Sequence, residues 1–313
     1  MQQSISPHRA REAQRAERNR EELAERIGHA LLEEGRNEPL KGLHFIRTSS
    51  PTERAHGTSV PSLCVIAQGA KEVYLGEDCF RYDPAHYLLA VVSLPVVIQI
   101  AEASIDRPFL SLRLDLEPSL VSSVMVEAGL PASRTHISAR AIDVSPLEPN
   151  LLDALVRLVR LVDSPAEARV MQPLVTREIV YRLLVGAQRD RLHHLTQLGG
   201  STTRIANAVE QLRTNYDKPL RVETIASELG MSVSGFHAQF KAVTAMSPLQ
   251  FQKHIRLQEA RRLMIGGDLD AASVGHRVGY EDASHFTREY KRLFGEPPVR
   301  DVQRVRAVAT ADL

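Results

Sequence analysis

The chain has 313 residues, enough for two or three domains, and its 25% charged residues, 43% hydrophobic residues and net charge of +1 are ordinary values for a globular protein. It contains no run of about 18 apolar residues, and its N-terminus lacks the apolar core of a signal peptide, which argues against a membrane span and against export. The two cysteines, Cys64 and Cys79, form neither a metal-type pair nor a disulfide framework, so we expect a reducing, cytoplasmic setting.

Residues 8–34, near the N-terminus, are rich in helix formers and balanced in charge. They predict a mostly solvated helix with one short apolar stripe, made by Leu23, Ile27 and Leu31. We therefore expect residues 1–40 to form a helical arm that docks on the rest of the protein through this stripe.

Between about residues 61 and 115 the chain consists of short β-rich runs separated by Gly, Pro and Asp turns, among them PSLCVIAQG, KEVYL, HYLLAVV and FLSLRLDL. Many short strands at such close spacing predict an antiparallel sandwich or barrel. A helix is expected over 117–129, and one further strand near 136–144.

Two apolar helices are expected next, one over 150–162 and one over 173–187. Pro173 would occupy the first turn of the second helix, where proline is well tolerated. Helices with so wide an apolar face either pack on their own barrel or pair with a second copy of the chain, and both alternatives stay open. The Gly-rich stretch QLGGST, residues 197–202, predicts a linker.

The last hundred residues contain an internal repeat, in which residues 225–248 parallel residues 274–298. Each copy reads as a short helix, a glycine turn at Gly230 or Gly279, and a second helix that opens on a capping residue, which is a helix-turn-helix. We expect the two glycines to supply the positive φ of a tight turn. A small residue in each first helix, Ala226 or Gly275, would let the second helix cross closely.

The two motifs are joined by a predicted helix over about 248–265, which spans about 26 Å at 1.5 Å per residue. With packing offsets added, the two second helices would lie about 34 Å apart, one turn of DNA. Its basic residues suit phosphate contact, with solvated helix charge as the alternative for each: Lys253, Arg256, Arg261 and Arg262.

The stretch GYEDASHFTREYKRLFGEPP closely resembles the second half of the AraC-type DNA-binding domain. The runs PSLCVIAQGAKEVYLG and RYDPAHYLLAVVSLPVVIQIAEAS are similar to the N-terminal domain of AraC-type regulators. The resemblance implies an α+β multidomain protein: a cupin-like barrel for effector binding and dimerisation over 41–196, a linker over 197–202 and a double helix-turn-helix domain over 203–313.

The implied function is that of a cytoplasmic, nucleoid-associated transcriptional regulator. Its implied partners are double-stranded DNA, RNA polymerase, a small-molecule effector and a second copy of itself. Activation, which is common in the family, and repression both stay open. A regulator without a small ligand, controlled by a partner protein or by its own abundance, is the alternative.

In relatives, the N-terminal half of each second helix enters the major groove. Carried over by position, this implies base-facing roles for Ser234, His237, Ala238, Ala283, Ser284, Thr287 and Arg288. Arg288 is the strongest reader, because a guanidinium bonds guanine O6 and N7 bidentately. Lys241 and Lys291, with Lys253 and Arg256, are expected on phosphates. For Ser234 and Ser284, ordinary first-turn helix chemistry is the alternative.

The chain departs from the family pattern at two places. Ala238 stands where many relatives have arginine, so the first motif is expected to read less of the sequence. Asp301 and Val302 stand where P-x-x-Y-R is usual, which predicts a different packing at the C-terminal end.

A cupin-like barrel also invites an enzymatic interpretation. Cupin metal sites gather two or three histidines and a carboxylate, whereas His44, His56 and His86 are widely separated here and His193–His194 lie on different faces of a helix. We therefore expect no enzyme, no metal and no other cofactor. Cys64 is either a buried small hydrophobe or a thiol that senses an electrophile or an oxidant. Pairing with Cys79 would need Cα atoms within about 7 Å.

Overall fold

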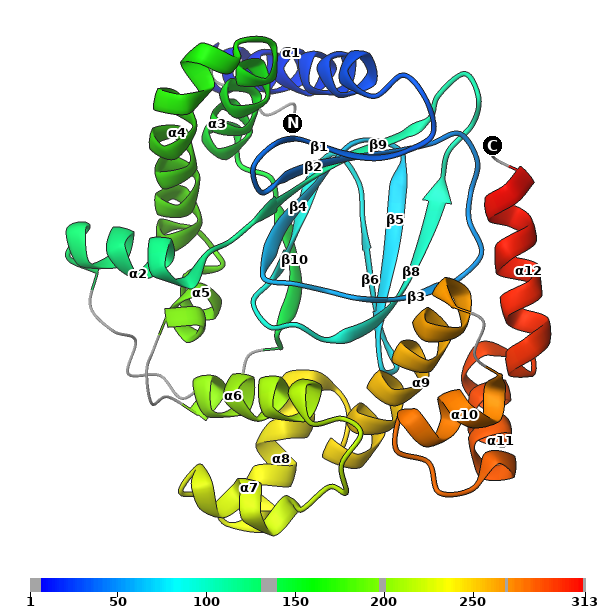
Figure 1. Cartoon of the computed structure of the whole chain (residues 1–313). Coiled ribbons are helices and arrows are strands. Elements are labelled where there is room, and N and C mark those ends of the chain that lie inside the picture. Colours follow the sequence, from blue (N-terminus) through cyan, green and yellow to red (C-terminus); the bar gives the residue numbers. More distant parts are fainter. Residues whose placement is uncertain (1–6, 131–139, 197–200, 268–269, 312–313) are drawn as a thin grey trace, which may run out of the picture. The chain divides into compact units, whose positions relative to one another are not determined.

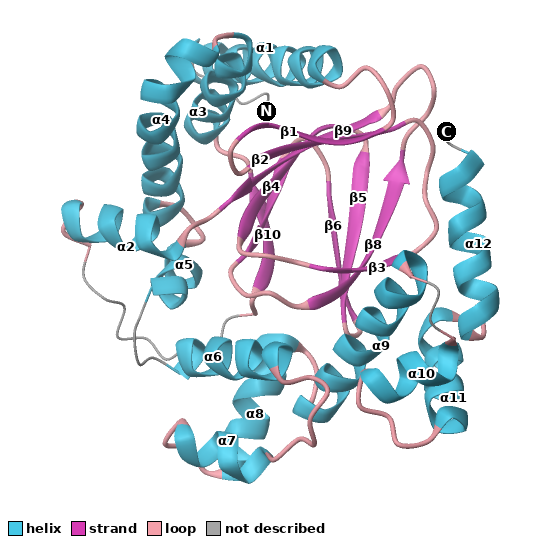
Figure 2. Cartoon of the chain, viewed as in Figure 1, coloured by secondary structure: helices cyan, strands magenta, loops and turns pink. Residues whose placement is uncertain are grey.

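The computed structural model describes residues 7–130, 140–196, 201–267 and 270–311. The chain divides into two compact units, Met1–Thr203 and Arg204–Leu313 (Figure 1). The N-terminal unit combines antiparallel sheets with helices, and the described part of the C-terminal unit is helical (Figure 2). The α+β class predicted from the sequence is thereby confirmed.

In the described residues, the strands of the N-terminal unit form two antiparallel sheets, as the close spacing of the β-rich runs predicted. The larger sheet has the order β1 (Gly35–Leu40), β2 (Leu43–Thr48), β9 (Phe109–Asp115), β4 (Ser62–Gln68), β7 (His86–Ala90) and β10 (Ile142–Pro146). The smaller sheet has the order β3 (Ala55–Thr58), β8 (Pro95–Glu102), β5 (Ala70–Leu75) and β6 (Asp78–Tyr82).

The two faces of the larger sheet differ because side chains alternate along each strand. On β9, Leu110, Leu112 and Leu114 are buried and lie on the face that meets helix α1 (Pro7–Ala30), where Gly28 comes close to Leu110. Arg113 and the other intervening side chains of β9 must therefore point to the opposite face. This face is turned toward the smaller sheet, because Cys64 of β4, which shares it, lies within electrostatic reach of Lys71 of β5. We call the space between the two sheets the interior of the barrel.

Helix α1 is attached to the body along one side, and most of its other described side chains are exposed or half-buried, as predicted. Leu23 and Ile27 are buried, as the apolar stripe predicted, while Leu31 lies beyond the end of the helix and is half-buried. The helix contacts β4, β9 and helix α3 (Pro149–Arg160), and Arg160 pairs with Glu22 at 2.6 Å. Residues Gly35–Leu40 at the end of the predicted arm pair with β2 as a strand that the sequence did not predict.

The helix predicted to start at Pro173 in fact begins eight residues earlier, so that prediction was wrong. Helix α4 runs over Pro165–Val185, with Pro165 in its first turn and Pro173 inside it. An interior proline loses one backbone hydrogen bond. The burial of Val175, Ile179 and Leu183 on the same helix offsets that cost. The remaining helices of this unit are α2 (Pro118–Glu127), the 3-10 turn η1 (Leu161–Asp163) and α5 (Arg189–Thr196).

The C-terminal unit contains the two predicted helix-turn-helix motifs. The first comprises α7 (Val222–Glu228) and α8 (Val233–Thr244), and the second comprises α10 (Ala271–Arg277) and α11 (Ala283–Phe294). The turn glycines have positive φ as predicted, 64° at Gly230 and 90° at Gly279. Helix α9 (Pro248–Gly266) joins the motifs, and α6 (Ser201–Thr214) and α12 (Pro298–Ala311) flank them.

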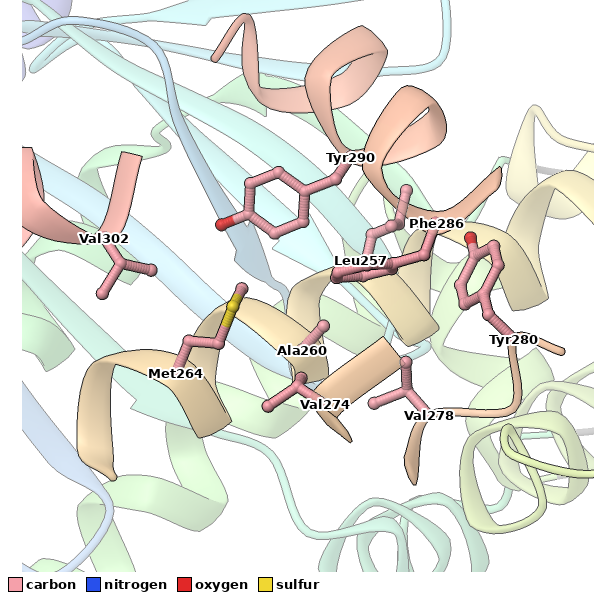
Figure 3. Packing of buried hydrophobic residues seen from close by; sticks show 9 residues of the cluster. All are labelled: Leu257, Ala260, Met264, Val274, Val278, Tyr280, Phe286, Tyr290 and Val302. Carbon is pink, nitrogen blue, oxygen red and sulfur yellow. The ribbon is translucent and has the colours of Figure 1, made fainter. Parts of the chain in front are cut away.

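The second motif is built around a single apolar cluster (Figure 3). Leu257, Ala260 and Met264 of α9 meet Phe286 and Tyr290 of α11, and the cluster is completed by Val274, Val278, Tyr280 and Val302. Within the described parts of the chain, no helix is both long and apolar enough to cross a membrane.

Candidate nucleic-acid interface

Helices α8 and α11 each have one buried face and one free face. Phe236 and Phe240 of α8 are fully buried, as are their counterparts Phe286 and Tyr290 of α11. Phe294 is half-buried and packs against the apolar cluster of the second motif. On the opposite faces, these predicted DNA-contacting residues are exposed: Ser234, His237, Ala238 and Lys241 on α8, and Ser284, Arg288 and Lys291 on α11.

Serine and aspartate caps fix the first turn of each helix, where the predicted reading residues lie. The Ser232 hydroxyl accepts a hydrogen bond from the Gly235 amide at 3.2 Å, and the Asp282 carboxylate accepts one from the His285 amide at 2.5 Å. A capped first turn holds the neighbouring side chains in a fixed orientation. Both helices therefore present a preformed N-terminal end.

Arg288 is exposed, and the structure gives its guanidinium no hydrogen bond or ion pair with any described residue. Lys241 and Lys291 are likewise unpaired within the described chain. Arg292, one turn further along α11, is instead bonded to Glu289 at 2.9 Å. The unpaired cations keep all their donors available for an external anion or a base edge.

Three of the predicted base-facing residues are less free. Ala283 and Thr287 are half-buried, and the Thr287 hydroxyl donates to the Ala283 carbonyl at 2.9 Å. The Ser234 hydroxyl lies 3.4 Å from that of Ser232, which fits the alternative of first-turn helix chemistry. Ser284 and Arg288 are thus the most accessible polar positions predicted to face bases on α11.

Two contacts hold α11 at its place in the unit. A Cβ added to Gly275 would lie 3.0 Å from the Phe286 ring, so the close crossing predicted at this position is real. Asp301 is fully buried, and its carboxylate accepts hydrogen bonds from the Tyr290 hydroxyl at 2.8 Å and from Arg261 at 2.7 and 2.8 Å. Asp301, where the chain departs from the family pattern, therefore belongs to a buried polar network that links α9, α11 and α12.

The cations of the connecting helix are mostly engaged within the protein. Arg256 donates to the backbone carbonyls of Tyr216 at 2.6 Å, Gly279 at 2.7 Å and Lys218 at 2.9 Å. This arrangement makes Arg256 a clamp between segments and removes the physical basis for its predicted phosphate contact. Lys253 pairs with Glu289 at 2.5 Å, so it could reach a phosphate only by leaving that carboxylate.

Sequence reasoning missed this clamp because its partners lie between 23 and 40 positions away along the chain. One signal was available. Gly279 was predicted to have positive φ, and a Cβ there would lie 2.2 Å from the Asp217 carbonyl oxygen and 2.8 Å from the Arg256 guanidinium. A glycine so closely surrounded indicates that another segment approaches its backbone.

In the N-terminal unit, no group of three or more histidine, cysteine and acidic residues among the described residues could hold a metal ion. His44 is hydrogen-bonded to Asp115 at 3.1 Å and His86 to Asp83 at 2.8 Å, whereas the side chains of His193 and His194 lie outside the described set.

Both cysteines are free thiols. Cys64 on β4 points into the barrel, where it is half-buried and burial raises the pKa of its thiol. Cys79 on β6 is exposed and stands opposite Tyr74 of β5 in the strand register. The Tyr74 hydroxyl accepts a hydrogen bond from Arg54 on the outer surface. The two thiols therefore point into different environments, and the conditional pairing considered for them is not formed.

Two family models match the chain. The model described as "AraC-type transcriptional regulator N-terminus" matches residues 39–191, and a model described as "Helix-turn-helix domain" matches residues 225–304. Together they cover most of the barrel and of the two helix-turn-helix motifs.

Curated relatives are similar over part of their length. The HTH-type transcriptional activator RhaS of Escherichia coli is 23% identical over 158 residues, which are 50% of this chain and 56% of that protein. The MmsAB operon regulatory protein of Pseudomonas aeruginosa is 32% identical over 95 residues, 30% of this chain and 31% of that one. The chain thus spans about half the length of the first of these relatives.

Among solved structures, an apo variant of ToxT from Vibrio cholerae superposes with a TM-score of 0.52 at 11% identity, covering 82% of this chain and 96% of that one. A ToxT structure described as bound to an unsaturated fatty acid superposes with a TM-score of 0.50 at 10% identity, with 82% and 94% coverage. At such identity the likeness shows the fold alone.

Proposed function

The chain belongs to the AraC family of transcriptional regulators, and on that premise we propose that it is a sequence-specific DNA-binding regulator controlled by a small effector in its N-terminal barrel. The observation that carries the proposal is the pair of capped helices α8 and α11, which expose equivalent polar positions opposite a buried aromatic face. An exposed polar face on a rigidly packed helix is what insertion into a major groove requires.

The proposed contacts divide into two kinds. Arg288 and Ser284 on α11, with Ser234 and His237 on α8, would read base edges, and Lys241 and Lys291 would contact phosphates. The first motif carries Ala238 where the second carries Arg288, so it would contribute affinity more than specificity. Ala283 and Thr287, being half-buried, would offer apolar contact to a thymine methyl group rather than hydrogen bonds.

The experiment that tests this function is selection of duplexes from a random library with the full-length protein. We expect an enriched site with two blocks about 10 base pairs apart, one for each motif. One of the blocks should contain an invariant guanine that lies against Arg288. Enrichment of no sequence above the input library would overturn the proposal, as would binding that depends only on duplex length.

Dimerisation is a further part of the proposal, and helix α4 supports it. Val170, Leu174, Tyr181 and Val185 are all large and exposed, between 46% and 66% of their surface. Their spacing places them along one side of the helix, in a stripe that we call the α4 stripe. The face of α3, by contrast, is buried within its own unit. The α4 stripe is therefore the surface we propose for pairing two copies.

The other expectations follow from the family. A regulator of this kind would work in the cytoplasm on the nucleoid, engage RNA polymerase and catalyse no reaction. The alternative in which Cys64 senses electrophiles or oxidants is not favoured by its surroundings, because burial raises its pKa and keeps it as the less reactive thiol. Replacement of Cys64 by serine should therefore leave promoter responses to aldehydes and peroxide unchanged.

A further inference from the structure

Two cationic side chains point into the interior of the N-terminal barrel from opposite sheets. Arg113 of β9 is opposite Cys64 in the strand register and shares its face, the one turned away from α1. Lys71 of β5 comes from the smaller sheet and is opposite Tyr82 of β6. The charge of Lys71 acts on the Cys64 thiol and that of Arg113 acts on Lys71, which places all three groups close together across the interior.

These cations are only partly compensated. Lys71 makes no hydrogen bond or ion pair with any described residue. Arg113 uses its Nε to donate to Asp115 at 2.9 Å, and Asp115 is shared with His44 at 3.1 Å. The structure gives the terminal guanidinium nitrogens of Arg113 no partner among the described residues. Two cations thus face a single carboxylate, and several N–H donors stay available.

The position of Lys71 is costly as it stands. Its side chain keeps some accessible surface, yet burial lowers the pKa of its amine. Both observations hold if the accessible part faces the interior of the barrel instead of bulk solvent. An ammonium group that is removed from water without a partner destabilises the fold, and a bound anion would offset that cost.

Apart from Tyr82, the neighbours of Lys71 on the inner face are apolar. Val73 lies two residues after Lys71 on β5. On β8, Ile100 stands opposite Lys71 and Ile98 stands opposite Val73. On β7, Leu88 stands opposite Cys64. Val73 and Leu88 are buried, whereas Ile98 and Ile100 are only half-buried, and a small inorganic anion would leave these two side chains uncovered. A molecule with one carboxylate and a hydrocarbon body matches both the excess of one positive charge and the apolar surroundings.

We propose that the barrel binds an organic monocarboxylate, held by Lys71 and Arg113, with its hydrocarbon part packed on Ile98 and Ile100. This inference rests on the proposed effector control and names the class of effector. The charge-assisted hydrogen bonds to Lys71 and Arg113 would give preference for the carboxylate over an uncharged analogue. Inorganic phosphate would satisfy the cations without using the apolar wall, so it should bind more weakly than the organic acid.

The test is isothermal titration calorimetry on the full-length protein with octanoate, octanamide and inorganic phosphate as probes. We expect octanoate to bind at least about tenfold more tightly than octanamide or phosphate. The Lys71→Met variant keeps the aliphatic stem and removes the charge, and it should lose this preference. Lys41→Met removes one exposed charge from the same unit and should keep it.

A fold control accompanies the titrations. Because Lys71 carries an uncompensated charge, Lys71→Met should raise the thermal unfolding midpoint of the ligand-free protein, whereas a purely structural lysine would lower it on removal. Equal affinity for octanoate and octanamide would overturn the proposal, and so would equal behaviour of the two methionine variants or no binding of any probe. Affinity for the selected duplex, measured in parallel, reports separately on the proposed DNA-binding function.

Discussion

At the scale of single residues, the two helices proposed to read DNA are unequal. Arg288 on α11 has an exposed guanidinium with no partner in the described chain, whereas the equivalent position on α8 is Ala238. Ser234 lies beside the hydroxyl of Ser232 and is partly occupied in the helix cap. Sequence specificity should therefore depend mainly on α11.

Arg288→Ala should weaken binding to the selected duplex by about 1–3 kcal/mol and relax the preference at one base pair. Ser234→Ala should cost clearly less. Arg288→Lys separates the two possible roles of this cation, because lysine can replace arginine at a phosphate but cannot bond guanine bidentately. Fluorescence anisotropy on matched and single-substituted duplexes, at several salt concentrations, measures all three variants.

Equal losses for Arg288→Ala and Ser234→Ala would show that the reading helix is wrongly assigned. Full activity of Arg288→Lys on the matched duplex would make Arg288 a phosphate contact. In that case the alanine variant should also lower the salt dependence of binding by about one phosphate.

At the scale of elements, much of the fold follows from local patterns. The strands within residues 61–115 and both helix-turn-helix motifs were predicted because period-two runs, caps and turn glycines are local signals. Strand β1, with the polar sequence Gly-Arg-Asn-Glu at its start, has no such pattern and forms because β2 offers it a partner. The clamp at Arg256 and the network at Asp301 escaped prediction for a different reason, because they include partners that are distant in sequence.

The network at Asp301 should be a large contributor to the stability of the C-terminal unit. Asp301→Asn leaves Arg261, whose side chain is 18% exposed, without a counter-charge, and this should cost about 3–5 kcal/mol. Tyr290→Phe removes one hydrogen bond but keeps the ring in the core, and should cost about 1 kcal/mol. Urea denaturation of the two variants compares them directly, and an Asp301→Asn loss no larger than that of Tyr290→Phe would contradict this role.

The attachment of α1 to α3 should depend on pH. A hydrogen bond from Arg160, with further help from Arg26, lowers the pKa of Glu22 to about 2 from an ordinary value of 4.5. Because the folded state binds this proton less readily than the unfolded state, the pair stabilises the protein fully above about pH 4.5. That contribution is lost as the pH falls toward about 2.

Glu22→Gln should therefore destabilise the protein by about 1 kcal/mol at neutral pH, a modest value because the pair is partly exposed to solvent. The difference from wild type should shrink as the pH falls toward about 2. Glu25→Gln changes an exposed carboxylate on the same helix and is the matched control. Urea titrations between neutral and acidic pH measure the difference, and a gap that is constant with pH would exclude the pair with Arg160 as its cause.

At the scale of the whole molecule, the proposed pairing through the α4 stripe would connect assembly with DNA binding. One chain carries the two proposed reading helices and would occupy one DNA site. In a pair of chains, binding of the first chain to its site would raise the effective concentration of the second chain at a neighbouring site. Leu174, in the middle of the stripe and 56% exposed, is the position at which a charge would do most damage to a paired interface. A glutamate there would have to be buried against an apolar partner surface.

Leu174→Glu should thus convert a dimer into a monomer in sedimentation equilibrium while leaving the unfolding midpoint nearly unchanged, because the residue is exposed in the single chain. Affinity for a duplex with one selected site should stay at the wild-type value, and affinity for a duplex with two sites should fall at least about tenfold. Ile105→Glu alters another exposed apolar residue, 84% accessible, and should change neither quantity. If the Leu174→Glu variant stays dimeric, the copies pair through another surface. If the wild-type protein is monomeric and still binds the two-site duplex with full affinity, DNA binding does not depend on pairing.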